Sequence, residues 1–171
     1  MKRLNTEDLV ILGILTAVLF AGQVAMAFLP NVEIVSLLVI LYTLVLGRKV
    51  FFIIYAFALL EGMFYGFGIW WINYLYVWSI LALVVLAFRG QKSVLLFSII
   101  SGFFGIAFGA LCAVPYLFAG GPGAALSYWL SGLPFDIAHC IGNVAVCLLL
   151  FKPLYAVLSK LNQGKKKGTV G

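Results

Sequence analysis

The chain has 171 residues, of which 65% are hydrophobic and only 9% are charged, and its formal net charge is +6. No soluble domain of this length could bury so much apolar surface, so the composition excludes a soluble enzyme or binding module. The three cysteines lie in apolar stretches in an odd number and without metal-ligand spacing, so we expect no disulfide framework, no metal and no cofactor.

The apolar stretches predict an all-α integral membrane bundle of six helices. We expect one membrane domain over residues 1–161, followed by a basic cytoplasmic tail, 162–171, that is disordered. The predicted spans are residues 9–29, 32–47, 50–67, 74–88, 94–114 and 134–158.

The first span carries a stripe of small residues, Gly13, Ala17, Ala21 and Ala25, at every fourth position. Small residues at this spacing allow another helix to approach closely. The spacing alone favours packing inside this chain over docking of a partner helix. The sequence Ala25-Met26-Ala27 imitates a signal-peptide cleavage site, but the acidic residues Glu7 and Asp8 precede the apolar run and argue against that interpretation.

The third span contains Glu61, which falls in the half of the helix far from the basic pair Arg48 and Lys49. The turn that follows, residues 66–73, is rich in Gly and Trp. It includes Trp71 and Asn73 and begins a cluster of aromatic residues, most of which we expect in an interfacial belt.

The fifth span carries a second stripe at every fourth residue, which predicts another close-packing face: Ser101, Gly105, Gly109 and Ala113. A long break is expected over residues 115–133, which include Tyr128 and Trp129. This stretch is too apolar for a solvated linker and too rich in Gly for a span, so we expect a lid or a re-entrant segment over a cavity.

The sixth span is predicted to begin at Pro134, because proline suits the first position of a helix. Asp136 then falls in the first turn, and His139 and Asn143 follow on the same face. Asp136 fits a helix-start carboxylate as well as a ligand contact, and His139 taken alone fits a packing residue. A polar stripe inside a membrane nevertheless marks a functional face.

The distribution of charge predicts the orientation. With six spans, all 11 Lys and Arg residues fall on one side of the membrane, and the other side has none. By the positive-inside rule both termini are then cytoplasmic. The positive charge therefore concerns topology and anionic lipid, and it does not indicate nucleic-acid binding.

The polar residues of the outer half predict a pocket that opens outward, with aromatic walls. The predicted ligand-binding residues are Glu61, Trp71, Asn73, Tyr128, Trp129, Asp136, His139 and Asn143. Because no Lys or Arg lies on this side, a phosphorylated or dianionic ligand is disfavoured. A neutral or weakly basic ring compound is favoured, and a larger ligand such as a cobalamin stays open.

Three other classes of membrane protein are weaker fits. The sequence has no complete phosphate-binding loop, which excludes an ATPase, and no internal repeat of the kind found in many secondary transporters. Ser101 and His139 suggest an intramembrane serine protease, but we expect most of the membrane to separate them.

The chain resembles the S components of energy-coupling factor (ECF) transporters over residues 9–161. The similarity lies in the six spans, the small-residue stripe, Pro30-Asn31-Val32-Glu33, and the Leu133-Pro134-Phe135-Asp136…His139…Gly142-Asn143 stretch. The resemblance implies a multi-pass protein of the bacterial plasma membrane that captures a vitamin or related micronutrient and performs no catalysis. It also implies partners, a T component and two ATPases, with Gly13, Ala17, Ala21 and Ala25 as the docking face for the T component. A self-sufficient secondary transporter is the alternative.

Overall fold

The computed structural model describes residues 4–29 and 31–168, with side chains up to Leu161. Within these residues the chain is all-α, as expected, and contains no strand. Five of its helical stretches are long and apolar enough to cross a membrane, which is compatible with a multi-pass membrane protein. The elements are α1 (Thr6–Met26), α2 (Val35–Leu46), the 3-10 turn η1 (Gly47–Lys49), α3 (Val50–Tyr65), α4 (Ile69–Tyr74), α5 (Val77–Ala87), α6 (Val94–Cys112) and α7 (Val114–Gly168).

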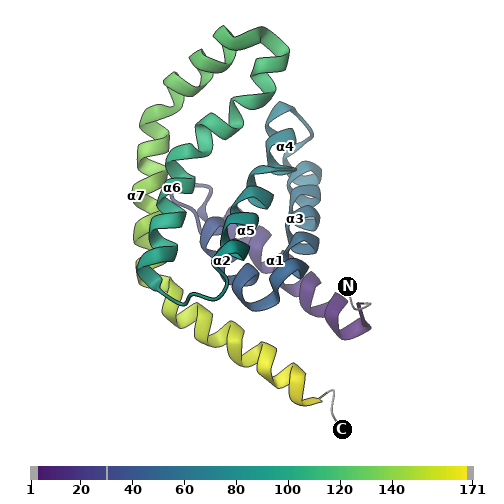
Figure 1. Ribbon diagram of the computed structural model, residues 1–171. Helices are drawn as coiled ribbons and strands as arrows, with labels where there is room; N and C mark the ends of the chain where they lie inside the picture. The colour runs from purple at the N-terminus through teal and green to yellow at the C-terminus, as the bar shows by residue number, and fades with distance from the viewer. Residues whose placement is uncertain (1–3, 30, 169–171) are drawn as a thin grey trace.

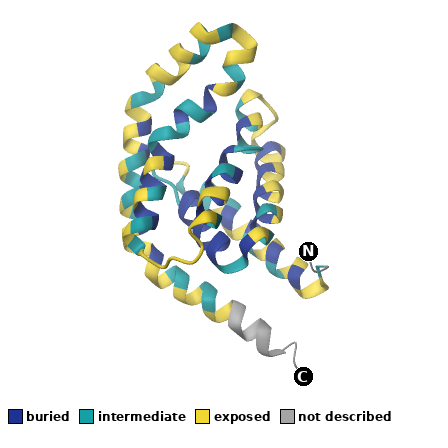
Figure 2. Ribbon diagram, viewed as in Figure 1, coloured by how far each residue is buried: buried dark blue, intermediate teal, exposed yellow. Residues whose placement is uncertain are grey.

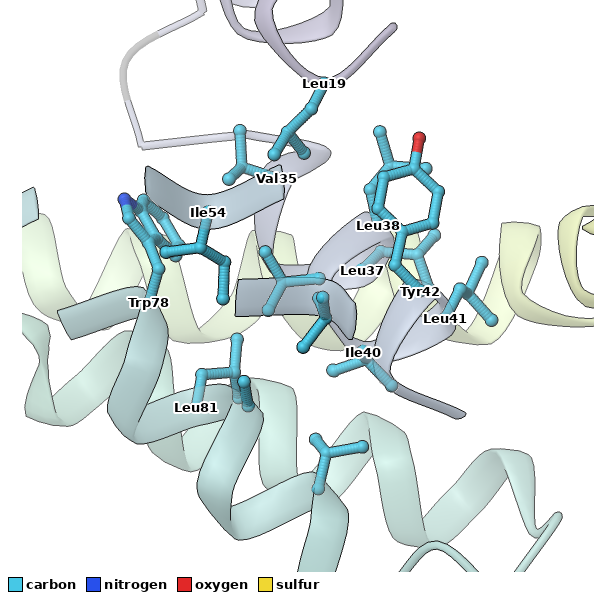
Figure 3. Close-up of a cluster of buried hydrophobic side chains, with 14 of the residues drawn as sticks. Leu19, Val35, Leu37, Leu38, Ile40, Leu41, Tyr42, Ile54, Trp78 and Leu81 are labelled. Atoms are coloured by element: carbon cyan, nitrogen blue, oxygen red, sulfur yellow. The ribbon is translucent and has the colours of Figure 1, made fainter. Parts of the chain in front are cut away.

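Helix α2 is the centre of the bundle. Every residue from Val35 to Leu44 is buried, so this helix is apolar on all sides, as expected of a helix surrounded by others. It contacts α1, α3, α5, α6 and α7. Figure 3 shows Leu37 and Ile40 of α2 among Ile54 of α3 and Leu81 of α5. The bundle is therefore built around a short central helix.

The predicted second and third spans form one apolar stretch, Val35–Tyr65, interrupted only by η1. At 12 residues α2 is about 18 Å long, which is shorter than the hydrocarbon core of a bilayer. Gly47 takes a positive φ of 61°, and the chain turns there into α3. Lys49 reaches from this turn to the buried carboxylate of Asp8, at 2.8 Å, and so fixes the start of α1 against η1.

Helix α1 packs against α3 with a face that includes Leu12, Thr16 and Leu19. Its stripe of small residues, Gly13, Ala17, Ala21 and Ala25, lies on the opposite, exposed face. A Cβ built on Gly13 would have no atom within 4 Å. The interpretation favoured by the spacing alone, packing inside this chain, is therefore wrong for the part of the chain that the structure describes.

The expected break over residues 115–133 is also wrong, because this region is helical except at Gly121. Gly121, with φ of 77° and ψ of −176°, ends one helical arm, and Pro122 begins the next. The Ala and Leu residues that follow favour a helix. Helices α6 and α7 thus form an antiparallel hairpin whose tip projects beyond the other helices (Figure 1).

Two further corrections concern α7. Pro134 lies inside the helix, so Asp136 is not in a first turn and its interpretation as a helix-start carboxylate does not apply. The helix also continues to Gly168, through most of the segment 162–171 for which the sequence predicts a disordered tail. Residues 169–171 lie outside the residues that the structure describes. Lysine is a good helix former, and no proline follows Pro153 to end the helix. Figure 1 shows the C-terminal part of α7 changing direction and leaving the bundle.

The second small-residue stripe packs as predicted. A Cβ on Gly105 would lie 2.8 Å from the backbone nitrogen of Cys140, and one on Gly109 would collide with the Asp136 carboxylate.

Outside such contacts the helices expose apolar side chains, among them Leu95 of α6 and Leu149 of α7, as Figure 2 shows for the outer faces. Exposed apolar area on this scale is atypical of a soluble monomer and is compatible with contact with lipid.

Gly105→Ala is expected to destabilise the protein, because the added Cβ would push α6 away from the backbone of α7 at Cys140. The expected loss is about 1–3 kcal/mol. Gly132→Ala is the matched control, since nothing lies within 4 Å of a Cβ there and alanine favours a helix. Thermal unfolding of the purified variants in detergent should lower the Tm for Gly105→Ala only. Equal Tm values for the two variants would contradict this packing.

Candidate functional site

A cavity of about 480 Å³ lies between α1, α3, α4, α5, α6 and α7, at the end of the bundle opposite η1. This volume is within the range of small-molecule sites in proteins. Its walls combine acidic, amide and aromatic side chains with a few apolar ones. The lining residues are Gln23, Met26, Ala27, Leu29, Asn31, Val32, Glu33, Glu61, Tyr65, Trp70, Tyr74, Trp78, Phe108 and His139.

Two carboxylates reach the cavity and differ in their surroundings. Glu33 is held by its neighbours: Oε1 lies 3.2 Å from His139 Nε2, and Oε2 accepts a hydrogen bond from the backbone N–H of Ser36 at 2.8 Å. Glu61, on α3, is 1% exposed, and its Oε1 has no hydrogen-bond partner among the described residues. A buried carboxylate oxygen without a partner is costly, so Glu61 is a lining group that a ligand could satisfy. The indole N–H of Trp78, also in the lining, has no hydrogen-bond partner among the described residues either.

Four aromatic rings form a continuous wall beside these carboxylates. Trp70 packs edge-on against Tyr74 at 5.3 Å between ring centroids, and Tyr74 does the same with Trp78 at 5.7 Å. Phe108 of α6 continues the wall at 5.8 Å from Trp78 and meets the His139 ring at 5.0 Å. Trp78 is 2% exposed, so this part of the aromatic cluster is not the interfacial belt that we expected.

The chain between α1 and α2 covers one side of the cavity. Asn31 has a φ of 59°, a left-handed conformation that asparagine tolerates, and its side chain belongs to the lining. Its carbonyl oxygen lies 3.1 Å from the position of a Cβ on Gly142, so Gly142 lets this segment approach α7 closely. Gln23 of α1 donates to the Tyr74 hydroxyl at 3.3 Å and joins α1 to the aromatic wall.

Of the predicted ligand-binding residues, the structure brings Glu61 and His139 to the cavity. Asn143 lies one helical turn from His139 and is 1% exposed. Its amide donates to Ser36 Oγ and to the carbonyl of Ser101, at 3.2 Å each, and so joins α7 to α2 and α6. Asp136 accepts a hydrogen bond from Gly109 N–H at 3.0 Å, between α6 and α7. Both residues hold helices together outside the cavity lining.

The other predicted residues also lie outside the lining. Trp71 donates to the carbonyl of Ala58 at 2.7 Å and so folds α4 back onto α3. Asn73 is buried, with its Oδ1 2.9 Å from the Tyr76 hydroxyl. Tyr128 stacks on Tyr116 at 4.3 Å in the α6–α7 hairpin, and Trp129 follows it there with 37% of its surface exposed.

Ser101 and His139 are closer than the sequence suggested, because the α6–α7 hairpin places Ser101 beside Asn143. No hydrogen bond joins them, however. Ser101 Oγ has no hydrogen-bond partner among the described residues, and His139 Nε2 is engaged with Glu33. A general base must lie within hydrogen-bond reach of its nucleophile, so this pair lacks the geometry of a serine protease site.

A scan against protein-family models and searches of curated proteins and of solved structures return no match. The site is therefore interpreted from its own chemistry. Among the described residues no group of three or more His, Cys, Asp or Glu side chains could hold a metal ion. An unsatisfied carboxylate, a Glu–His pair and an aromatic wall are instead suited to holding a small organic molecule by hydrogen bonds and stacking.

Several lining residues were not predicted as ligand-binding. Trp70 and Tyr74 are four positions apart in α4, and this spacing was a signal that they share a face, whereas Trp78 lies in α5 after a break in the helix. Glu33 entered the sequence analysis only within the stretch Pro30-Asn31-Val32-Glu33 of the family resemblance. Gln23 and Phe108 lie within apolar spans, and nothing in the sequence distinguishes them from packing residues.

Proposed function

We propose that this chain is the substrate-binding S component of an ECF-type importer, which captures a vitamin-like micronutrient from outside the cell for ATP-driven uptake by partner subunits. The observation that carries the proposal is the exposed stripe Gly13, Ala17, Ala21 and Ala25 on α1. Small residues on an exposed helix face provide a surface that a second helix can approach closely. The sequence resemblance assigns that surface to a T component.

The cavity supports the same proposal. A site of about 480 Å³ at one end of a small bundle suits a compound of one or two rings better than a macrocycle. The chain contains no phosphate-binding loop, so the energy for uptake must come from other subunits or from an ion gradient, and the proposal assigns it to the ATPase partners. In this proposal the chain binds its substrate without altering it chemically.

The proposed orientation places η1 and the end of α5 at the cytoplasmic face of the plasma membrane, with six crossings and the cavity outside. The basic residues Arg48 and Lys49 lie in η1, and Arg89 and Lys92 lie between α5 and α6. The positive-inside rule supports this assignment.

We expect Ser127→Cys to be labelled by a membrane-impermeant thiol reagent in intact cells and Lys92→Cys to be protected. The reason is that Ser127 lies near the tip of the α6–α7 hairpin and Lys92 at its opposite end. The measurement uses a background in which the three native cysteines, Cys112, Cys140 and Cys147, are replaced. Labelling of Lys92→Cys but not of Ser127→Cys would reverse the orientation.

The test of the proposed function is purification of the tagged chain from its native membranes. The expected result is co-purification of a T component and two ATPases, together with a small molecule that mass spectrometry identifies. The same molecule should be recovered unchanged after incubation with the purified chain. Absence of any ATPase, or recovery of a chemically altered compound, would contradict the proposal.

A further inference from the structure

We propose that the cavity selects an organic monocation with a flat ring, for which the Glu61 carboxylate is the counter-ion and the aromatic wall is the binding surface. This inference rests on the proposed function, since it names the class of substrate that the same site would hold. The sequence favoured a neutral or weakly basic ligand, and this inference limits the expected ligands to compounds that carry a positive charge.

The first argument is that Glu61 has a ligand position that the protein itself does not fill. Its side chain is 1% exposed, it lines the cavity, and its Oε1 makes no hydrogen bond within the described chain. Leaving a buried carboxylate without a partner is costly, whereas pairing it with an opposite charge inside a cavity removes most of that cost.

The second argument is that the other acidic residue is already engaged. Glu33 has one oxygen beside His139 Nε2, at 3.2 Å, and the other on the N–H of Ser36, at 2.8 Å. The two carboxylates are therefore not equivalent: Glu33 is fixed within the protein, and Glu61 is the one available to a ligand.

The third argument is the absence of a competing positive charge. No Lys or Arg is among the described residues that line the cavity, and the basic residues Arg48, Lys49 and Arg89 lie at the opposite end of the bundle. An anionic ligand would meet the field of two carboxylates with only His139 to oppose it. Since no group of three or more His, Cys, Asp or Glu side chains among the described residues could hold a metal ion, an organic cation is the ligand that this field favours.

The aromatic wall provides the rest of the recognition. Trp70, Tyr74, Trp78 and Phe108 all line the cavity, with successive ring centroids 5.3–5.8 Å apart. A desolvated cation over an indole or phenol ring is attracted by the ring quadrupole, and a flat ring also stacks on it. Glu61 and this wall both line the same cavity, so one bound cation could contact both.

The test uses three pyridines of similar size that differ in charge: 1-methylnicotinamide (cation), nicotinamide (neutral) and nicotinate (anion). Each is titrated up to about 10 mM, a range suited to ligands of this size, and affinity is obtained from the thermal stabilisation of the purified chain in detergent. We expect the cation to bind about tenfold or more tightly than the neutral compound, and the anion not to bind.

Two variants test the assignment to residues. Glu61→Gln keeps the shape of the side chain but removes its charge, so it should abolish the preference for the cation over nicotinamide. Trp70 is half-buried, so Trp70→Leu is expected to disturb folding less than a change at a fully buried residue. This variant should weaken binding of the cation more than binding of the neutral compound. Glu7→Gln, on an exposed residue at the far end of α1, is the control and should preserve the preference.

The inference is overturned if nicotinamide or nicotinate binds as tightly as the cation, if the cation does not bind, or if Glu61→Gln keeps the preference. These outcomes are distinct from failure of the proposed function. A chain without cation selectivity that still co-purifies with a T component and ATPases would keep the importer assignment and lose only the substrate class. A cation-selective chain that does not co-purify with those partners would keep the substrate class and lose the importer assignment.

Discussion

Ala17→Trp and Ala21→Trp are expected to abolish both uptake and co-purification of the chain with its partner subunits. Both alanines lie in the middle of the exposed stripe on α1. An indole on this face would hold a docked helix away from the α1 backbone, and close approach is what small residues make possible. Binding of substrate by the isolated chain should stay nearly unchanged, because neither residue lines the cavity.

Ala145→Trp is the matched control for these variants. Ala145 is an exposed small residue on α7 and does not belong to the stripe, so a Trp there changes another exposed surface without blocking the proposed docking face. It should co-purify with the partners as the unchanged chain does. Loss of substrate binding in Ala17→Trp would indicate a structural role for the stripe, and full retention of partners would contradict docking on α1.

His139→Ala is expected to have the opposite pattern, with loss of substrate binding and retention of the partners. His139 is buried, pairs with Glu33 at 3.2 Å and packs on Phe108 at the cavity wall. Removing it leaves Glu33 Oε1 without its partner, a change of about 1–3 kcal/mol, or about fivefold to 150-fold in affinity. The measurement is the amount of small molecule that stays bound through purification, quantified by mass spectrometry.

His139→Gln serves as the conservative comparison, because a glutamine amide can still donate to Glu33. It should retain more ligand than His139→Ala. If both variants kept the full amount of ligand, His139 would be a packing residue only. If His139→Ala also lost its partners, the site and the docking face would not be independent.

Much of the fold follows from the sequence because it depends on composition and spacing. The apolar runs predicted the helices, and Ser101, Gly105 and Gly109 predicted the close face between α6 and α7. The course of residues 115–133 did not follow, because a stretch that contains Gly and Pro predicts a break between helices. In the structure only Gly121 leaves the helical conformation.

The candidate site was predictable only in part. Glu61 and His139 were identifiable because ionisable residues are rare in apolar spans. Asn143 and Asp136 have the same signature, yet they hydrogen-bond between helices, and a sequence cannot distinguish a polar group that faces a cavity from one that joins two helices. Phe108 reaches the site because of how α6 packs against α7, which depends on tertiary contacts.

The most direct test of the central claim is transport by the purified chain alone in liposomes. The substrate is the compound identified by co-purification, supplied outside under a proton or sodium gradient and without ATP. We expect binding but no accumulation, and accumulation only when the T component and both ATPases are added with ATP inside. Gradient-driven accumulation by the chain alone would contradict the proposal and identify a self-sufficient secondary transporter.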